Sequence, residues 1–386
     1  MRKYYDTQSS CTHIITPCGS MSKRKEERFA WLDWARSFAI FAIIFCHCTE
    51  AIYSFDQTPL EVVDINVWFK FIFFTIGRLG VPVFLFLTGA LILSRYKFQD
   101  FSNVKQFYKR KWLPLLLCYE FWIVFYSLIT YFVSSQFDFL YFLQCLLLIR
   151  VPYFSHLWYM PMIIGIYLAI PILGFLIFKL GHQFVWGYLA LASISIVILP
   201  QLQQYIALDL SFCNSLYLYY VLAGYGLFSL LQPQVSQNSM KFWLICVTAI
   251  IAISLFVLVV KNQISSHVVG GGFYVWYSYP CLILLAIVLF PLFTVFDRIK
   301  STFISKISVS AFGMYLVHMF NLTIFRDVFN LTSFFECLSL SLPIRVVFLQ
   351  CVIFGVSFLE VFLIMKFVPK ISSKLFLTKL SPQGRN

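Results

Sequence analysis

Residues 33–50, DWARSFAIFAIIFCHCTE, decide how this chain folds. The stretch is apolar and long enough for a membrane-spanning helix, yet it contains Arg36 and His47. An ionisable group inside a membrane span costs about 3 kcal/mol on the milder scales, so each one marks a candidate functional site. On a helix with 100° and 1.5 Å per residue, Arg36 and His47 lie on one face, roughly 16 Å apart along the axis. We therefore interpret them as two parts of a single site.

The composition of the chain is that of a polytopic membrane protein. Of its 386 residues, 60% are hydrophobic and 12% are charged, whereas soluble domains are about half apolar and a quarter charged. The alternating pattern of outer-membrane barrels is absent, so we predict an all-α fold. We attribute the net charge of +13 to basic cytoplasmic loops and expect no nucleic-acid partner. The 11 cysteines have no metal-binding spacing, so we expect packing residues and no metal.

The apolar segments predict about ten transmembrane helices. The second contains Gly77, Gly80 and Pro82, so we expect it to tilt or break there. Residues 139–149 are too short to span a membrane and are predicted to lie at the interface or to re-enter. The predicted spans are residues 33–53, 67–94, 113–134, 156–178, 184–200, 214–231, 242–260, 274–295, 307–326 and 343–366.

The distribution of Lys and Arg predicts the orientation. Counted along the sequence with these spans, 22 lie on one side and 3 on the other, which places both termini in the cytoplasm. Arg36 then lies near the cytoplasmic face and His47 lies deeper. Residues 1–29 and 367–386 are predicted cytoplasmic basic tails around a membrane domain at 30–366. Residues 1–28 do not resemble a cleavable signal peptide. Because Met21 looks like a natural start, residues 1–20 are a candidate mis-assigned extension.

Several short motifs follow one another in a fixed order along the chain. They are Arg36-x10-His47, GRLGVPVFLFLTGALIL (77–93), Pro114 after Lys109-Arg110-Lys111, HLWYMPMIIGIYLAIPIL (156–173), YVLAGYGLF (220–228) and SVSAFGMYLVHMF (308–320). Together, over about residues 30–366, they resemble the acyltransferase-3 family of membrane acyltransferases. The layout is most similar to the compact ten-span branch that includes O-acetyltransferases of enterobacterial surface glycans.

The resemblance implies an activity and a location. The family transfers an acyl group, usually acetyl from cytoplasmic acetyl-CoA, to hydroxyls of cell-surface or exported glycans. It also implies a bacterial inner-membrane protein whose partners are membrane lipid, acetyl-CoA and a glycan or lipid-linked saccharide. Many members have Arg-x-x-Arg in the third-span loop. Here position 107 is Phe, which weakens a CoA role for Arg110.

Three residues are candidates for the catalytic chemistry. His47 is the candidate general base or transient acyl carrier, because an imidazole with a pKa near ~6.5 can take a hydroxyl proton at neutral pH. The alternative is a neutral histidine hydrogen bonded within the helix bundle. Glu50, three residues later, could orient His47 or be an interfacial carboxylate. His318, in an apolar setting, is either a catalytic partner or a buried structural residue.

Four residues are candidates for binding the acyl-CoA. Arg36 suits the CoA phosphates because a guanidinium fork matches phosphate oxygens, and Asp33 could hold it. The alternative for Arg36 is a snorkelling anchor. Arg78 lies nearer mid-membrane than an anchor should, so it needs a carboxylate, a carbonyl or a substrate anion. Arg110 belongs to a basic cluster that is either a cofactor site or a positive-inside anchor.

The acceptor side has fewer candidates. His156 and Trp158 begin the fourth span at the outer face, where an imidazole beside an aromatic ring suits a sugar, although Trp is also an ordinary interfacial residue. Glu120 and Glu360 are intramembrane carboxylates that could pair with Arg78 or His318.

The sequence therefore predicts a membrane O-acetyltransferase that uses acetyl-CoA. One alternative is a transporter or flippase for a glycolipid or polysaccharide, with His47, Arg78 and Glu360 as a proton relay. Another keeps the chemistry and changes the acyl group, for example to succinyl.

Overall fold

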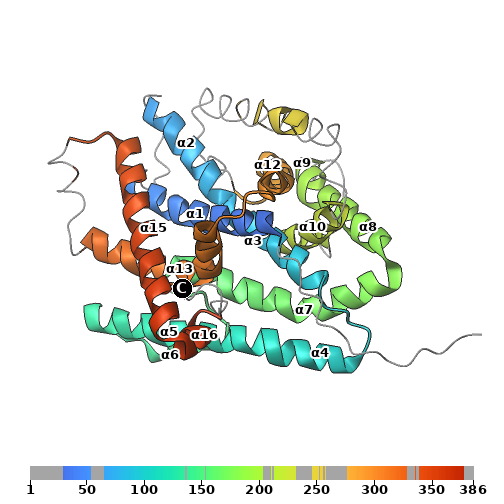
Figure 1. The fold of residues 1–386 in the computed structure, drawn as a ribbon, viewed down its shortest axis with the longest axis horizontal. Coiled ribbons are helices and arrows are strands. Elements are labelled where there is room, and N and C mark those ends of the chain that lie inside the picture. Colours follow the sequence, from blue (N-terminus) through green and yellow to red (C-terminus); the bar gives the residue numbers. More distant parts are fainter. Residues whose placement is uncertain are drawn as a thin grey trace, which may run out of the picture.

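The fold is shown by a computed structural model (Figure 1). It describes residues 29–53, 65–134, 137–152, 154–202, 213–231, 246–251, 276–327 and 339–377, together with the isolated residues 210, 253, 254, 257 and 335. All regular secondary structure in these residues is helical, which confirms the predicted all-α fold.

Among the residues that the structure describes, six helical segments are long and apolar enough to cross a membrane. They are Ala30–Tyr53, Ile65–Leu93, Phe101–Phe132, His156–Leu180, Thr302–Asp327 and Leu342–Phe367. Three shorter apolar helices, His182–Ile198, Leu216–Leu231 and Pro280–Phe296, coincide with three further predicted spans. The remaining predicted span, 242–260, lies mostly outside the described residues. The chain is thus a helical membrane protein, while the total of ten spans and the cytoplasmic termini stay predictions.

Helix α1 (Ala30–Tyr53) lies at the centre of the bundle (Figure 1). It packs against α2 (Ile65–Arg78), α3 (Gly80–Thr88), α13 (Thr302–Asp327) and α15 (Leu342–Phe367). Small side chains such as Ala35, Ala39 and Ala42, all fully buried, let neighbouring backbones come close. Most of the first span is therefore buried against other helices.

The second span is broken where the sequence predicts. Helix α2 ends at Arg78, Leu79 forms a turn, and α3 begins at Gly80. Pro82 lies in the first turn of α3, where its missing N–H costs no helical hydrogen bond. A Cβ added to Gly77 would lie 2.7 Å from Cys46 Cα, so this glycine allows α2 to approach α1 closely. The break and this contact bring Arg78 to the second half of α1.

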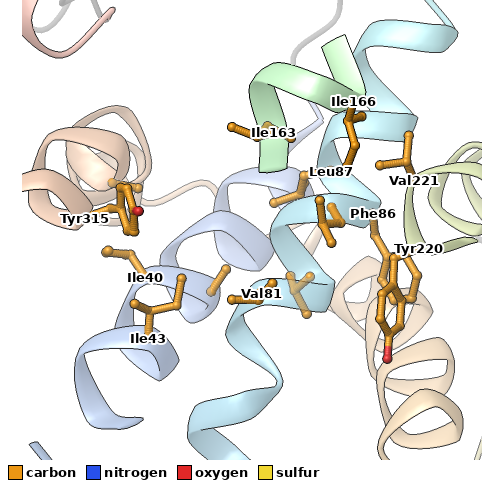
Figure 2. Packing of buried hydrophobic residues seen from close by; sticks show 14 of the residues in the cluster. Ile40, Ile43, Val81, Phe86, Leu87, Ile163, Ile166, Tyr220, Val221 and Tyr315 are labelled. Atoms are coloured by element: carbon orange, nitrogen blue, oxygen red, sulfur yellow. The ribbon is translucent and has the colours of Figure 1, made fainter. Parts of the chain in front are cut away.

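The core continues from α3 to α10 (Leu216–Leu231). Figure 2 shows side chains of α3 between α1 on one side and α10 on the other. The π-helical turn η1 (Gly89–Leu93) extends α3, and a Cβ on Gly89 would lie 1.8 Å from the Val221 carbonyl oxygen. A Cβ on Gly224 would likewise lie 2.3 Å from the backbone of Phe86. The two backbones are therefore in direct contact.

The other helices surround this core. They are α4 (Phe101–Phe107), η2 (Tyr108–Trp112), α5 (Leu113–Ser134), α6 (Phe139–Leu146), η3 (Ser155–Trp158), α7 (Tyr159–Leu180), α8 (His182–Ser193), η4 (Ile194–Ile198), α9 (Leu199–Leu202), α12 (Pro280–Leu292), η6 (Phe293–Phe296) and α16 (Pro369–Leu375). Helix α6 has 8 residues, so the segment predicted to be too short to cross a membrane is a short helix.

Candidate active site

A carboxylate joins the first two spans at the candidate site. Glu50 accepts a hydrogen bond from His47 Nδ1 through Oε2 at 2.7 Å, and another from Arg78 Nη2 through Oε1 at 3.1 Å. Cys46 Sγ lies 3.7 Å from the same Oε1. The Arg78 guanidinium is buried and lies over the Trp276 ring at 4.5 Å from its centroid. The carboxylate thus has a cation on one oxygen and an imidazole on the other.

The sequence suggested Glu120 or Glu360 as the carboxylate partner of Arg78, but the partner in the structure is Glu50. Glu50 fills this position, because its two oxygens can serve His47 and Arg78 together. Glu360 instead accepts a hydrogen bond from Asn321 Nδ2 at 3.1 Å. Glu120 lies in α5 and is not among the residues that line the cavity described below.

Three histidines from distant parts of the chain meet beside this carboxylate. The ring centroids of His47 and His318 are 5.3 Å apart, and those of His318 and His156 are 5.2 Å apart. His47 comes from α1, His156 from η3 and His318 from α13. His156 and His318 are 1% and 0% exposed, so neither is a surface residue. The fold therefore gathers the His47, His156 and His318 candidates in one place.

The hydrogen bonds fix where two of these rings carry their protons. His318 Nδ1 lies 2.7 Å from the Tyr315 carbonyl oxygen and 3.2 Å from that of Met314. Carbonyls only accept, so Nδ1 carries the proton and Nε2 has the lone pair. His47 Nδ1 faces an ionised carboxylate, so its lone pair is also on Nε2. With the proton on Nδ1, each of these two rings has its lone pair on Nε2.

A cavity adjoins His47 and His156. It encloses about 360 Å³ of unfilled space, part of it open to solvent. Aromatic rings form much of its wall: Trp158 lies 5.9 Å from Tyr277 between centroids, and Tyr315 lies 5.7 Å from His156. The lining residues are Ile43, Cys46, His47, Gly77, Arg78, Val81, His156, Trp158, Tyr159, Tyr277 and Tyr315. A ligand here would contact apolar and aromatic surface with a few polar groups, as is usual for small-molecule sites.

The other candidate pair lies near the start of α1. Arg36 Nη1 donates to Ser308 Oγ at 2.8 Å, and Ser308 Oγ donates to Asp33 Oδ1 at 2.7 Å. Arg36 Nη1 is also 3.6 Å from Asp33 Oδ1. The Arg36 side chain remains 28% exposed, so its guanidinium is held in position and still accessible. The sequence predicted the contact with Asp33 but not the one with Ser308.

The basic cluster around Arg110 is connected to this region by aromatic residues. Arg110 is exposed in η2, and the Gln106 side-chain oxygen accepts from its guanidinium at 3.0 Å in the favoured amide orientation. Burial raises the pKa of Tyr96, while the nearby Arg110 acts in the opposite direction. Tyr96 and Phe107 rings are 5.2 Å apart, and Tyr167 lies beyond Phe107 at 5.9 Å. Tyr167 also interacts electrostatically with Arg36.

Several contributors could not be identified from the sequence. Trp276 and Tyr277 contact Arg78, and Tyr277 also lines the cavity, but nothing in the sequence distinguishes them from other aromatic residues in a chain with 22 Tyr and 9 Trp. Tyr315 could have been identified from the sequence, because it lies three residues before His318 on the same face of one helix. Among the described residues, no group of three His, Cys, Asp or Glu side chains has a geometry that could hold a metal ion.

Comparison with known proteins identifies one family. The family model for the acyltransferase domain of the acyltransferase-3 type matches residues 29–361. This match contains the carboxylate contact, the three histidines and the Arg36 network. No curated protein and no solved structure matches the chain significantly.

Proposed function

This chain belongs to the acyltransferase-3 family, and on that premise we propose that it is a bacterial inner-membrane O-acetyltransferase. It takes acetyl from cytoplasmic acetyl-CoA and transfers it to a hydroxyl of a cell-surface or lipid-linked glycan. The family supplies the membrane acyltransferase activity. We take the proposed acetyl donor and glycan acceptor from the branch of this family that acetylates enterobacterial surface glycans.

The contact of His47 with Glu50 carries the proposal. Acyl transfer needs a group that can attack the thioester or take the proton of the acceptor. His47 lines the cavity and has its lone pair on Nε2. A positive charge that develops on His47 is stabilised by the Glu50 carboxylate at 2.7 Å. Arg78 pairs with the other oxygen of that carboxylate and orients it. We assign Arg78 to this positioning role in place of the CoA-binding role expected from the sequence.

The donor binds from the Arg36 end of α1. Arg36 contacts the CoA phosphates, with Asp33 and Ser308 holding the guanidinium, and Arg110 adds positive charge on the same predicted cytoplasmic side. The distance of roughly 16 Å along the helix from Arg36 to His47 suits an extended pantetheine arm. The thioester then reaches His47 while the phosphates stay at the membrane surface.

The acceptor binds from the opposite direction, where Trp158 and His156 line the cavity. Aromatic faces suit the C–H surface of a sugar ring, and the imidazole suits its hydroxyls. A transporter would need a relay through Glu360, whose described hydrogen bond is with Asn321. The arrangement therefore favours group transfer.

The test uses membranes that contain the protein and labelled acetyl-CoA. Wild type should transfer label to glycan extracted from the host, and His47→Ala should abolish transfer without loss of protein. Surface glycan from a deletion strain should lack one acetyl mass per modified sugar. Substrate transport with no dependence on acyl-CoA would contradict the proposal, and preferential use of succinyl-CoA would correct the acyl group.

A further inference from the structure

His156 has an environment that sugar binding alone does not explain. Its side chain is 1% exposed, it lines the cavity together with His47, and neither ring nitrogen makes a hydrogen bond of good geometry to any described residue. A buried polar group without a partner destabilises the folded state. Such a cost is common where a group is reserved for a ligand.

The neighbours of His156 leave one of its nitrogens available as a base. Two polar groups beside the ring are the Leu316 carbonyl and His318. The carbonyl only accepts, and His318 Nε2 only accepts because His318 donates through Nδ1 to Tyr315. Both can receive an N–H from His156, and neither can donate to it. The Tyr126 hydroxyl donates to the same Leu316 carbonyl at 2.6 Å, so its proton is not available to His156.

The cavity is too small for both substrates together. Its unfilled space of about 360 Å³ includes the part that is open to solvent, so the enclosed space is smaller still. A pantetheine thioester and a sugar ring would have to occupy it in turn. The acetyl group must then stay bound to the protein after the pantetheine thioester leaves and until the sugar binds. His47, which lines the cavity, supplies the nucleophile through Nε2.

We propose that His156 is the base that deprotonates the acceptor hydroxyl, while His47 carries the acetyl group. This assignment rests on the proposed function and deepens it. In the first step His47 Nε2 attacks the thioester carbon, the C–S bond breaks, and CoA leaves as the thiolate, which takes a proton from solvent. The acetyl-imidazolium is paired with Glu50. His47 cannot then act as the base, because its lone pair is in the new C–N bond.

In the second step His156 removes the hydroxyl proton and the hydroxyl oxygen attacks the acetyl carbon. The C–N bond breaks, and its electron pair returns to His47 Nε2. His156 is left as an imidazolium beside His318 Nε2, which can accept its N–H, and it later gives the proton to solvent. The sum of both steps is thioester plus hydroxyl giving ester plus CoA thiol. His318 is a positioning residue in this scheme.

The two steps can be measured separately. The first is read from exchange of labelled CoA into acetyl-CoA without an acceptor, and the whole reaction is read from acetyl on surface and lipid-linked glycan. We expect His156→Ala to keep exchange within a few-fold of wild type and to lose transfer by at least about 100-fold, the usual contribution of a positioned base. Added imidazole should restore part of the transfer, because the truncated side chain leaves space for it. His182→Ala, at an exposed histidine, is the matched control.

Each of the other possible outcomes contradicts the role of His156, the acetyl-His47 step or the proposed function. Loss of exchange in a His156→Ala protein with normal yield and melting temperature would show that His156 is not specific to the acceptor step. Transfer at the wild-type rate in that variant would also overturn its role as base. Wild type that transfers acetyl but shows no exchange would rule out acetyl-His47 and leave the proposed function standing. Wild type that transfers no acetyl at all would instead contradict the proposed function.

Discussion

The Glu50→Gln substitution tests how the carboxylate controls His47. The two oxygens of the Glu50 carboxylate accept hydrogen bonds from Arg78 Nη2 at 3.1 Å and from His47 Nδ1 at 2.7 Å. An amide has a single oxygen, and the charged Arg78 is the stronger donor, so the amide oxygen should face Arg78. The amide N–H₂ then faces His47 and favours the tautomer with its proton on Nε2. The nucleophilic lone pair is thereby removed from the cavity.

The expected loss follows from the hydrogen bond that is replaced. A hydrogen bond to a charged group contributes ~1.5–3 kcal/mol, and ~1.4 kcal/mol corresponds to a tenfold change in rate. We therefore expect acetyl-CoA/CoA exchange to slow by about 10- to 150-fold. Because the amide still bonds to Arg78, the melting temperature should change little.

The assay compares exchange rates in purified protein of equal yield and melting temperature. Glu120→Gln is the matched control, because Glu120 is also a glutamate in a predicted span but does not line the cavity. Exchange in Glu50→Gln at more than half the wild-type rate would refute the role assigned to the carboxylate. A similar loss in Glu120→Gln would show that the effect is not specific to the site.

Two further substitutions test the donor site and the packing of the bundle. Arg36→Ala should raise the KM for acetyl-CoA more than it lowers kcat. Arg36→Lys should restore little of the affinity for acetyl-CoA, because an ammonium lacks the guanidinium fork that binds Ser308 and phosphate. An unchanged KM in steady-state kinetics would contradict this role of Arg36. Gly89→Ala should destabilise the protein by about 1–3 kcal/mol, because its Cβ would lie 1.8 Å from the Val221 carbonyl oxygen. Gly165→Ala, with no atom within 4 Å of its Cβ, should leave the melting temperature unchanged, and an equal change in both variants would refute the packing argument.

Local geometry could be predicted from the sequence because it depends on helix spacing. The contacts of Arg36 with Asp33 and of His47 with Glu50 join residues three positions apart, and both are present. The break near Gly77 could also be predicted, because glycine and proline have known effects on helices. Composition and hydropathy were sufficient for the membrane location and the helical class.

Contacts between spans could not be predicted from a single sequence. The pairing of Arg78 with Glu50 depends on how α2 approaches α1, which the small volume of Gly77 permits but does not reveal. The meeting of His47, His156 and His318 depends on three helices that are far apart in the chain. A pattern with a period of 3.6 residues shows which side of one helix is polar. It does not show which other helix faces it.

The pairs within α1 also bear on how the protein enters the membrane. Arg36 and its partner Ser308 are 272 residues apart, and at about 5–20 residues per second the ribosome needs roughly 14–54 s to make the intervening chain. During that interval α1 has no α13 to receive its polar groups. Its ionisable residues are nevertheless arranged as two neighbouring pairs, Asp33 with Arg36 and His47 with Glu50. The first span thus contains a hydrogen-bonding partner for each of these groups when it leaves the translocation machinery.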